Sequence, residues 1–190
     1  MEKQLRALLL DVLGHQKYLA LVSEVYIRLI RSGFLKKKYP ELFFLQQLVK
    51  PGFVCVDIGA NVGYYSVFLS QYAGAHGHVH AVEPVDLFAS IFRKNVTQFG
   101  LGNITLHQTA LGGEHKTIEM GTPMVDADFR HGLTKDIDSH AQEANMHTYQ
   151  VAMQIPDELF AHLTRFDFLK CDVEGYEVFV MPHFIKTIAK

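Results

Sequence analysis

The apolar residues of the chain change their spacing near residue 50. Before it they recur at intervals of three and four, which places them on one face of a helix. The first such positions are Leu5, Leu8, Leu9 and Val12, and a second set runs from Tyr18 to Leu29 after Gly14. Pro40 can begin a further helix, which Pro51 and Gly52 would end. We therefore expect an N-terminal helical segment over residues 1–50 and the main domain over 51–190.

From residue 53 onward, short apolar runs alternate with helical patterns. The expected strands are Phe53–Ile58, His78–Val82, Ile104–His107 and Phe166–Cys171. The expected helices are Tyr64–Tyr72, Asp86–Phe99 and Gly175–Ala189, the last with a break at Pro182. Short buried strands separated by helices are typical of an α/β fold with a mostly parallel sheet.

The segment Gly112–Gln154 lacks this alternation. Thr117–Met120 and Tyr149–Met153 could pair as strands around a long polar connection. Because long connections in compact domains are commonly functional, we expect substrate contacts there.

Composition narrows the class of protein. The 190 residues are 48% apolar, enough for one domain with a full core. The net charge of −2 gives no global field that would recruit nucleic acid or an acidic membrane. No apolar stretch is long enough for a transmembrane helix and the N-terminus is a poor signal peptide, so we expect a cytoplasmic protein. Cys55 and Cys171 lie in apolar runs, which favours reduced core residues over a disulfide.

A local cluster of cations interrupts this near-neutral composition. Lys36, Lys37 and Lys38 follow Arg28 and Arg31. Such a cluster is either a solvated helix end or a site for an anionic substrate or lipid head group.

The stretch Val54–Gly63 carries the strongest chemical signal. A buried strand runs into a turn with Gly59 and Gly63, and a helix follows. In nicotinamide-binding proteins this turn has a third, middle glycine and cradles a pyrophosphate, but here Asn61 takes that place. Asp57, at the strand end, would repel a pyrophosphate and suits a cationic amino group and sulfonium. The pattern therefore favours S-adenosyl-L-methionine over a dinucleotide.

A second acid, Glu83, ends the next strand, in Val79–Pro84. There a carboxylate can accept hydrogen bonds from both hydroxyls of a ribose. Either acid alone would be a weak signal, but acids on two neighbouring strand ends together indicate a nucleoside cofactor.

Three stretches, VDIGANVGYYS, AVEP and FLKCDVEGYE, resemble the FkbM family of S-adenosylmethionine-dependent methyltransferases, over Phe53–Lys190. The resemblance implies a Rossmann-like class I methyltransferase fold and O-methylation of a hydroxyl on a sugar, polyketide or related small molecule. It implies that Asp57, Gly59, Asn61 and Gly63 line the methionine part of the cofactor. Glu83 would hold the ribose, and Thr109–Leu111, with Ala110 at its centre, would lie near the adenine.

The same resemblance puts Asp172 opposite the transferred methyl group. Asp172 is the first candidate for the base that accepts the acceptor's proton, Glu174 the second and His131 the third. Glu174 could instead only stabilise the N-terminus of a helix starting at Gly175. Lys170 is a candidate substrate residue or an inner-strand lysine paired with an acid.

Metal binding is not expected. His78 and His80 would share one face of a strand, but no third ligand follows at suitable spacing. Asp172 and Glu174 could hold Mg²⁺ together with substrate oxygens, a less favoured alternative.

Class I methyltransferases have seven strands, whereas this chain ends after the helix that follows the fourth. We expect the fourth strand to lie at a sheet edge because the C-terminal strands are missing. The chain would then be truncated, a shortened homologue, or a subunit in which a partner, a second copy or the N-terminal helices cover this edge. Two other functions stay open. One is an inactive methyltransferase-like binding module, and the other is an NAD(P)-dependent oxidoreductase, which Asn61 disfavours.

Overall fold

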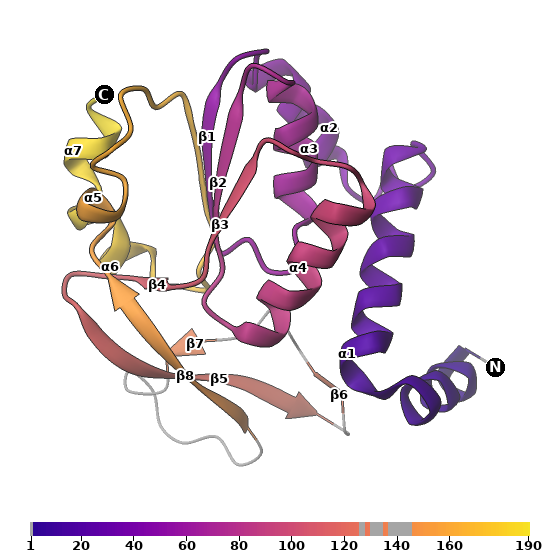
Figure 1. The fold of residues 1–190 in the computed structure, drawn as a ribbon. Coiled ribbons are helices and arrows are strands. Elements are labelled where there is room, and N and C mark those ends of the chain that lie inside the picture. The colour runs from indigo at the N-terminus through magenta and orange to yellow at the C-terminus, as the bar shows by residue number, and fades with distance from the viewer. Residues whose placement is uncertain (1, 126–127, 130–134, 137–145) are drawn as a thin grey trace.

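A computed structural model describes residues 2–125, 128–129, 135–136 and 146–190. Figure 1 shows a central sheet with helices α1–α4 on one side and α5–α7 on the other, and a second sheet below it. The expected α/β architecture is confirmed.

The central sheet has four parallel strands in the order β3-β2-β1-β9. They are β1 (Val54–Ile58), β2 (His78–Val82), β3 (Ile104–His107) and β9 (Phe168–Cys171). In this register Asp57 lies beside Ala81 on one neighbouring strand and Lys170 on the other. The carboxyl ends of all four strands therefore meet at one rim.

Both faces of the sheet are covered because successive side chains point to opposite sides. On one face Cys55 and Val79 pack against Phe68 of α3 (Tyr64–Ala73). Beside it, α4 (Asp86–Gln98) follows β2. On the other face Val56 packs against Phe160 and Phe184. These belong to the C-terminal layer of α5 (Pro156–Leu159), α6 (Glu177–Val180), a 3₁₀ turn (Met181–His183) and α7 (Ile185–Ile188).

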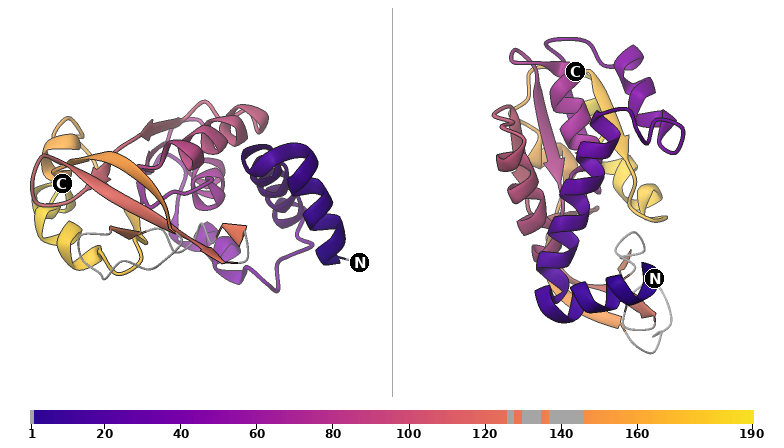
Figure 2. Two further views of the ribbon diagram at one scale, coloured as in Figure 1. Left: turned by 90° about the horizontal axis from the view of Figure 1, so that it is seen from below. Right: turned by 90° about the vertical axis from the view of Figure 1, so that its right-hand side faces the viewer.

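The N-terminal segment forms helices as predicted. Helix α1 (Glu2–Arg31) is interrupted at Gly14, where φ is 71° and ψ is 162°, and α2 (Pro40–Leu48) follows. Ile30 and Leu42 share a core cluster with Cys55 of the sheet, so this segment packs on the main domain. Figure 2 shows α1 on the side of the molecule away from the C-terminal helices. In the part of the chain that the structure describes, no helix has the length and apolar character needed to cross a membrane.

The second sheet is built around a long antiparallel pair, β5 (Lys116–Val125) and β8 (Met146–Gln154), which confirms the predicted pairing. Thr117 lies opposite Ala152 and Met120 opposite Tyr149. Three two-residue strands complete the sheet: β4 (Ala110–Leu111) beside β8, and β6 (Asp128–Phe129) and β7 (Lys135–Asp136) beside β5. The strands extend beyond the predicted bounds at both ends.

The fourth predicted strand lies at the edge of the sheet, as expected, but is shorter than predicted. Strand β9 begins at Phe168 rather than Phe166, and its residues are all half-buried because β9 is the edge of the sheet. Cys171 is therefore half-buried rather than a core residue. Cys55 is fully buried, and burial raises the pKa of its thiol to about 12. Both cysteines are free, as expected.

The helix expected from Gly175 begins instead at Glu177. Glu174 and Gly175 have φ of 53° and 92°, and Tyr176 N–H donates to Val173 O. Positive φ at both central residues is the pattern of a type I′ turn, which a helix cannot include. The predicted break at Pro182 is confirmed by the 3₁₀ turn.

Candidate cofactor-binding site

The turn after β1 is held by the end of β2. The N–H groups of Gly59 and Ala60 both donate to Val82 O, at 3.1 and 2.9 Å. Along the turn φ is 75° at Gly59, 50° at Asn61 and 96° at Gly63. Such angles are open to glycine and tolerated by asparagine, so the sequence of the turn follows from its backbone.

The fold itself leaves no room for a side chain at either glycine. A Cβ at Gly59 would collide with the carbonyl oxygen of Asp172, and one at Gly63 would lie 3.0 Å from the Phe92 ring. The resemblance to the FkbM family implies that both glycines line the methionine part of the cofactor. Close packing of β9 and α4 against the turn is already a sufficient reason for both glycines.

Asp57 is fully buried beneath this turn. Ser66 Oγ donates to Asp57 Oδ2 at 2.6 Å, and Lys170 Nζ lies 3.2 Å from Asp57 Oδ1. The second contact is an ion pair whose angles fall outside hydrogen-bond geometry, so Oδ1 accepts no hydrogen bond. The charge of Asp57 is thus balanced inside the protein.

Lys170 connects three parts of the site. Its ammonium donates to Gly59 O at 2.9 Å and to Ile58 O at 3.3 Å, and it lies 3.7 Å from Asp172 Oδ2. Burial alone would lower the pKa of Lys170, but the carboxylates of Asp57 and Asp172 outweigh it and the pKa is raised. Lys170 therefore stays charged, and its contacts match the alternative in which it pairs with an acid.

Glu83 is buried at the end of β2, and among the residues that the structure describes no cation forms an ion pair with it. Its Oε2 accepts from Asn61 N–H and its Oε1 from Val85 N–H, both at 2.9 Å. Burial raises the pKa of Glu83 to about 7 against these two hydrogen bonds. Lys170 and Asp57 also act on this pKa, so the two acids occupy one electrostatic neighbourhood.

The groups at this rim fit S-adenosylmethionine. A carboxylate has about four acceptor positions, of which Glu83 uses two, which leaves acceptors for ribose hydroxyls. Helix α3 starts after Gly63 without a side-chain cap, and such an N-terminus favours a ligand carboxylate. Asp57, Lys170 and Asp172 together carry a net negative charge, which suits a cationic amino group and sulfonium.

The two candidate bases lie in the turn after β9. Asp172 has a side chain 62% exposed. Glu174 is also exposed, and its pKa is raised by partial burial and by the neighbouring carboxylates of Asp172 and Glu177. Glu174 does not cap a helix at Gly175, because no helix begins there.

Glu177 was missing from the predicted site. Its Oε1 accepts from Val173 N–H at 2.9 Å, and backbone hydrogen bonds lower its pKa. This bond closes the turn that carries Asp172 and Glu174. The available signal was an acid at a helix start, which we had assigned to Glu174 instead.

The remaining predicted residues lie apart from these contacts. Ala110 is buried in β4 opposite Met153, and Thr109 Oγ1 donates to Ala152 O at 2.8 Å. This segment follows β3 directly, but no contact of Ala110 with the acids is recorded. His131 lies outside the described residues.

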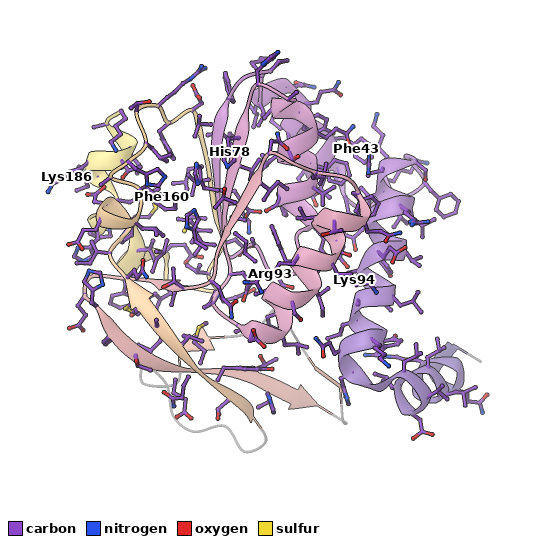
Figure 3. The ribbon with its side chains drawn as sticks, in the orientation of Figure 1. Phe43, His78, Arg93, Lys94, Phe160 and Lys186 are labelled. Atoms are coloured by element: carbon purple, nitrogen blue, oxygen red, sulfur yellow. The ribbon has the colours of Figure 1, made fainter. Side chains whose placement is uncertain are left out.

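The predicted histidine pair has two further members. His78 and His80 do share a strand face, with ring centroids 4.7 Å apart. His107 Nε2 lies 3.1 Å from His80 Nδ1, and the His162 ring centroid 5.6 Å from that of His80. The ring of Phe160, labelled in Figure 3, has its centroid 5.9 Å from that of His80 and 5.4 Å from that of His107. Burial, with the neighbouring histidines, lowers the pKa of His80 to about 4. Among the described residues, no three histidine, cysteine or acidic side chains are arranged to hold a metal ion.

A parallel α/β sheet with a glycine turn and acids at its carboxyl rim defines a Rossmann-like nucleoside-binding protein. The Methyltransferase FkbM domain matches residues 57–188. The chain therefore belongs to the FkbM methyltransferase family, and S-adenosyl-L-methionine is its cofactor, as the sequence led us to expect.

Individual relatives match shorter stretches. The chain is 34% identical over 55 residues to a protein-L-isoaspartate O-methyltransferase of Methanosarcina mazei, which covers 29% of this chain and 23% of that relative. It thus spans about a quarter of that protein's length. Among solved structures, a SAM dependent methyltransferase from Aquifex aeolicus is 25% identical with a TM-score of 0.34, covering 46% of this chain and 44% of the other. An rRNA methylase from Streptococcus thermophilus is 17% identical with a TM-score of 0.32, covering 36% and 39%.

Proposed function

We propose that the chain holds S-adenosylmethionine at the carboxyl ends of β1 and β2 and transfers its methyl group to a hydroxyl of a small molecule or sugar. The observation that carries this proposal is the meeting of Glu83, the glycine turn and the Asp57–Lys170–Asp172 group at one rim. The FkbM domain match over residues 57–188 supports it.

In this proposal Glu83 binds the ribose. Its two oxygens are fixed by Asn61 and Val85, so the carboxylate is oriented before any ligand arrives. Hydroxyl donors would stabilise its ionised form and so offset the burial that raises its pKa. Ala110 and its neighbours in β4 would lie near the adenine.

Asp57 and Lys170 have a positioning role. Asp57 is fully buried, and Lys170 links it to the carbonyl of Gly59. The pair fixes the turn, whose Asn61 and Gly63 would face the methionine part. Lys170 would also orient Asp172 through their 3.7 Å contact.

The bound cofactor supplies a methyl group on a sulfonium. Transfer is a displacement in which the acceptor oxygen gains the methyl group as the carbon–sulfur bond breaks, and alignment is the main contribution of a protein to such a step. The hydroxyl proton passes to a carboxylate of this chain. Asp172 and Glu174 are both exposed at the rim, and the raised pKa of Glu174 makes its carboxylate a better proton acceptor than an ordinary glutamate.

Binding is tested by isothermal titration calorimetry with S-adenosylhomocysteine. We expect Glu83→Gln to weaken affinity roughly tenfold or more, because a charged hydrogen-bond acceptor contributes about 1.5–3 kcal/mol. Glu41→Gln, which changes an exposed acid on α2, is the matched control and should bind as wild type. Equal affinity in all three proteins, or tighter binding of NADH than of S-adenosylhomocysteine, would contradict the proposal.

Transfer is tested with labelled S-adenosylmethionine and a panel of sugars and hydroxylated small molecules. We expect methylated product from at least one acceptor. Glu174→Gln and Asp172→Asn should each lower kcat by a larger factor than they change KM. A protein that binds the cofactor but labels none of these acceptors would be the inactive binding module instead.

A further inference from the structure

The turn between α1 and α2 has a fixed backbone. Phe34 N–H donates to Leu29 O at 3.1 Å and Gly33 N–H to Ile30 O at 2.8 Å, with φ of 82° at Gly33. This pair of hydrogen bonds is the Schellman motif that ends many helices. Residues 32–39, which we call the basic turn, are therefore ordered by the end of α1.

Phe34 points away from the protein at this turn. In a Schellman motif the residue in its position usually packs back against the helix. Here Phe34 is 79% exposed, while the next residue, Leu35, packs against the core cluster that includes Ile30 and Leu42. The fixed backbone thus holds one large aromatic ring in solvent.

Cations neighbour Phe34 along the chain, and Lys38 Nζ lies 5.3 Å from the ring centroids of Tyr26 and Tyr39. Lys36, Lys37 and Lys38 follow Phe34 and are all exposed, and Arg28 and Arg31 lie in the last turn of α1. Glu24 pairs with Arg28 at 2.8 Å, which leaves the lysines as the main charge. Because the whole chain carries −2, this positive charge is a local feature.

Further apolar surface lies on the next helix. Phe44 of α2 is 51% exposed, and Leu48, one turn further on, is also exposed. Lys36 Nζ lies 5.4 Å from the centroid of the Phe43 ring, so the basic turn and α2 are in contact.

We propose that the basic turn binds the surface of a membrane that contains anionic lipids, with Phe34 inserted among the head groups and the three lysines facing their negative charges. An aromatic ring beside clustered lysines suits a bilayer interface, where the ring is buried and the ammonium groups stay at the polar surface. A single-stranded nucleic acid would need a groove with several stacking platforms, whereas this turn offers one exposed ring. In Figure 1 the turn lies at the end of the molecule away from the second sheet. The carboxyl end of β3 leads toward that sheet, so membrane contact leaves the cofactor rim open.

The test is co-sedimentation of the full chain with phosphatidylcholine vesicles with and without about 30% phosphatidylserine. We expect binding only to the anionic vesicles, and its loss at 0.5 M salt. Replacing Lys36, Lys37 and Lys38 by glutamine should lower the partition coefficient about 100-fold, since each lysine near an anionic surface contributes about fivefold. Phe34→Ala should lower it about five- to tenfold.

Matched controls change the same residue types elsewhere. Figure 3 shows Lys94 on α4 and Lys186 near the C-terminus, and glutamine at these positions and at Lys17 removes the same charge. Phe179→Ala removes another exposed ring. The control with three other lysines replaced and the Phe179→Ala control should both bind vesicles as wild type does. All variants should keep wild-type affinity for S-adenosylhomocysteine. Equal binding to neutral and anionic vesicles, an unchanged partition coefficient in the lysine or Phe34 variants, or capture of a single-stranded oligonucleotide in place of vesicles would overturn the proposal.

Discussion

The ends of β1 and β2 each carry one buried acid, and the two acids are stabilised in different ways. Asp57 has a hydroxyl donor and a buried lysine within 3.2 Å. Glu83 has only two backbone N–H groups, and burial raises its pKa to about 7. The negative charge of Asp57 is thus balanced by Lys170. Glu83 has unused acceptor lone pairs, and burial disfavours its ionised form.

This difference assigns the two acids different tasks. A buried carboxylate with a matched cation supports the structure around it, and removal of either partner leaves an uncompensated charge. A buried carboxylate without one gains most when a ligand donates hydrogen bonds to it. We therefore propose that Glu83 is the acid that recognises the ligand and that Asp57 is the acid that holds the turn.

The largest expected effect is on the β1 side. Lys170→Met should lower the free energy of unfolding by about 3–5 kcal/mol, because it leaves Asp57 buried without its cation. Urea denaturation measures the loss. Lys186→Met, at an exposed position, should change stability by less than about 0.5 kcal/mol. Adding Asp57→Asn to Lys170→Met should recover part of the loss, and a Lys170→Met protein as stable as the control would refute the pairing role.

The next effect concerns the β2 side and depends on pH. Glu83 has a folded pKa of about 7 against an ordinary value of 4.5, so between these values the folded state holds a proton that the unfolded state has lost. Its contribution to stability is complete below pH 4.5 and falls as pH rises toward 7, by on the order of 3 kcal/mol. Urea denaturation at pH 5 and pH 8 should show a larger decrease for wild type than for Glu83→Gln. Equal decreases would mean that Glu83 titrates normally.

A smaller effect is expected where the turn after β1 contacts the end of β9. Gly59→Ala should destabilise the protein by about 2–3 kcal/mol, from the positive φ of 75° and the collision with the Asp172 carbonyl. Gly102→Ala, at a position with open space and no positive φ, is the matched control. Thermal melting compares the two variants. If Gly59→Ala had the same melting temperature as Gly102→Ala, the close contact between the turn and β9 would be wrong.

Sequence patterns predicted the first half of the main domain closely. The runs His78–Val82 and Ile104–His107 match β2 and β3 at both ends, because polar or glycine residues bound each short run on both sides. Strand β9 lies at a sheet edge as expected, but the apolar run Phe166–Cys171 placed its start two residues too early. The predicted start of the following helix was too early because a glutamate in the sequence does not indicate the positive φ of Glu174.

For the candidate site, the sequence predicted which acids stand at the strand ends, but not which residues they contact. Acids at strand ends could be read from single positions, so Asp57 and Glu83 were identified. Their partners lie 113 and 22 positions away, at Lys170 and Asn61, and only the fold selects such pairs. The same holds for His107 and His162, which join His78 and His80 from other elements.

The division of labour between the two acids is tested most directly by proton release on cofactor binding. Calorimetric titrations with S-adenosylhomocysteine at pH 6.5, in two buffers of different ionisation enthalpy, give the number of protons released. The account predicts release of about 0.5–0.8 proton by wild type and by Asp172→Asn, because the ribose hydroxyls would ionise Glu83. Glu83→Gln should release almost none. Proton release that is absent in wild type, or unchanged in Glu83→Gln, would contradict the assignment of Glu83 as the acid that recognises the ligand.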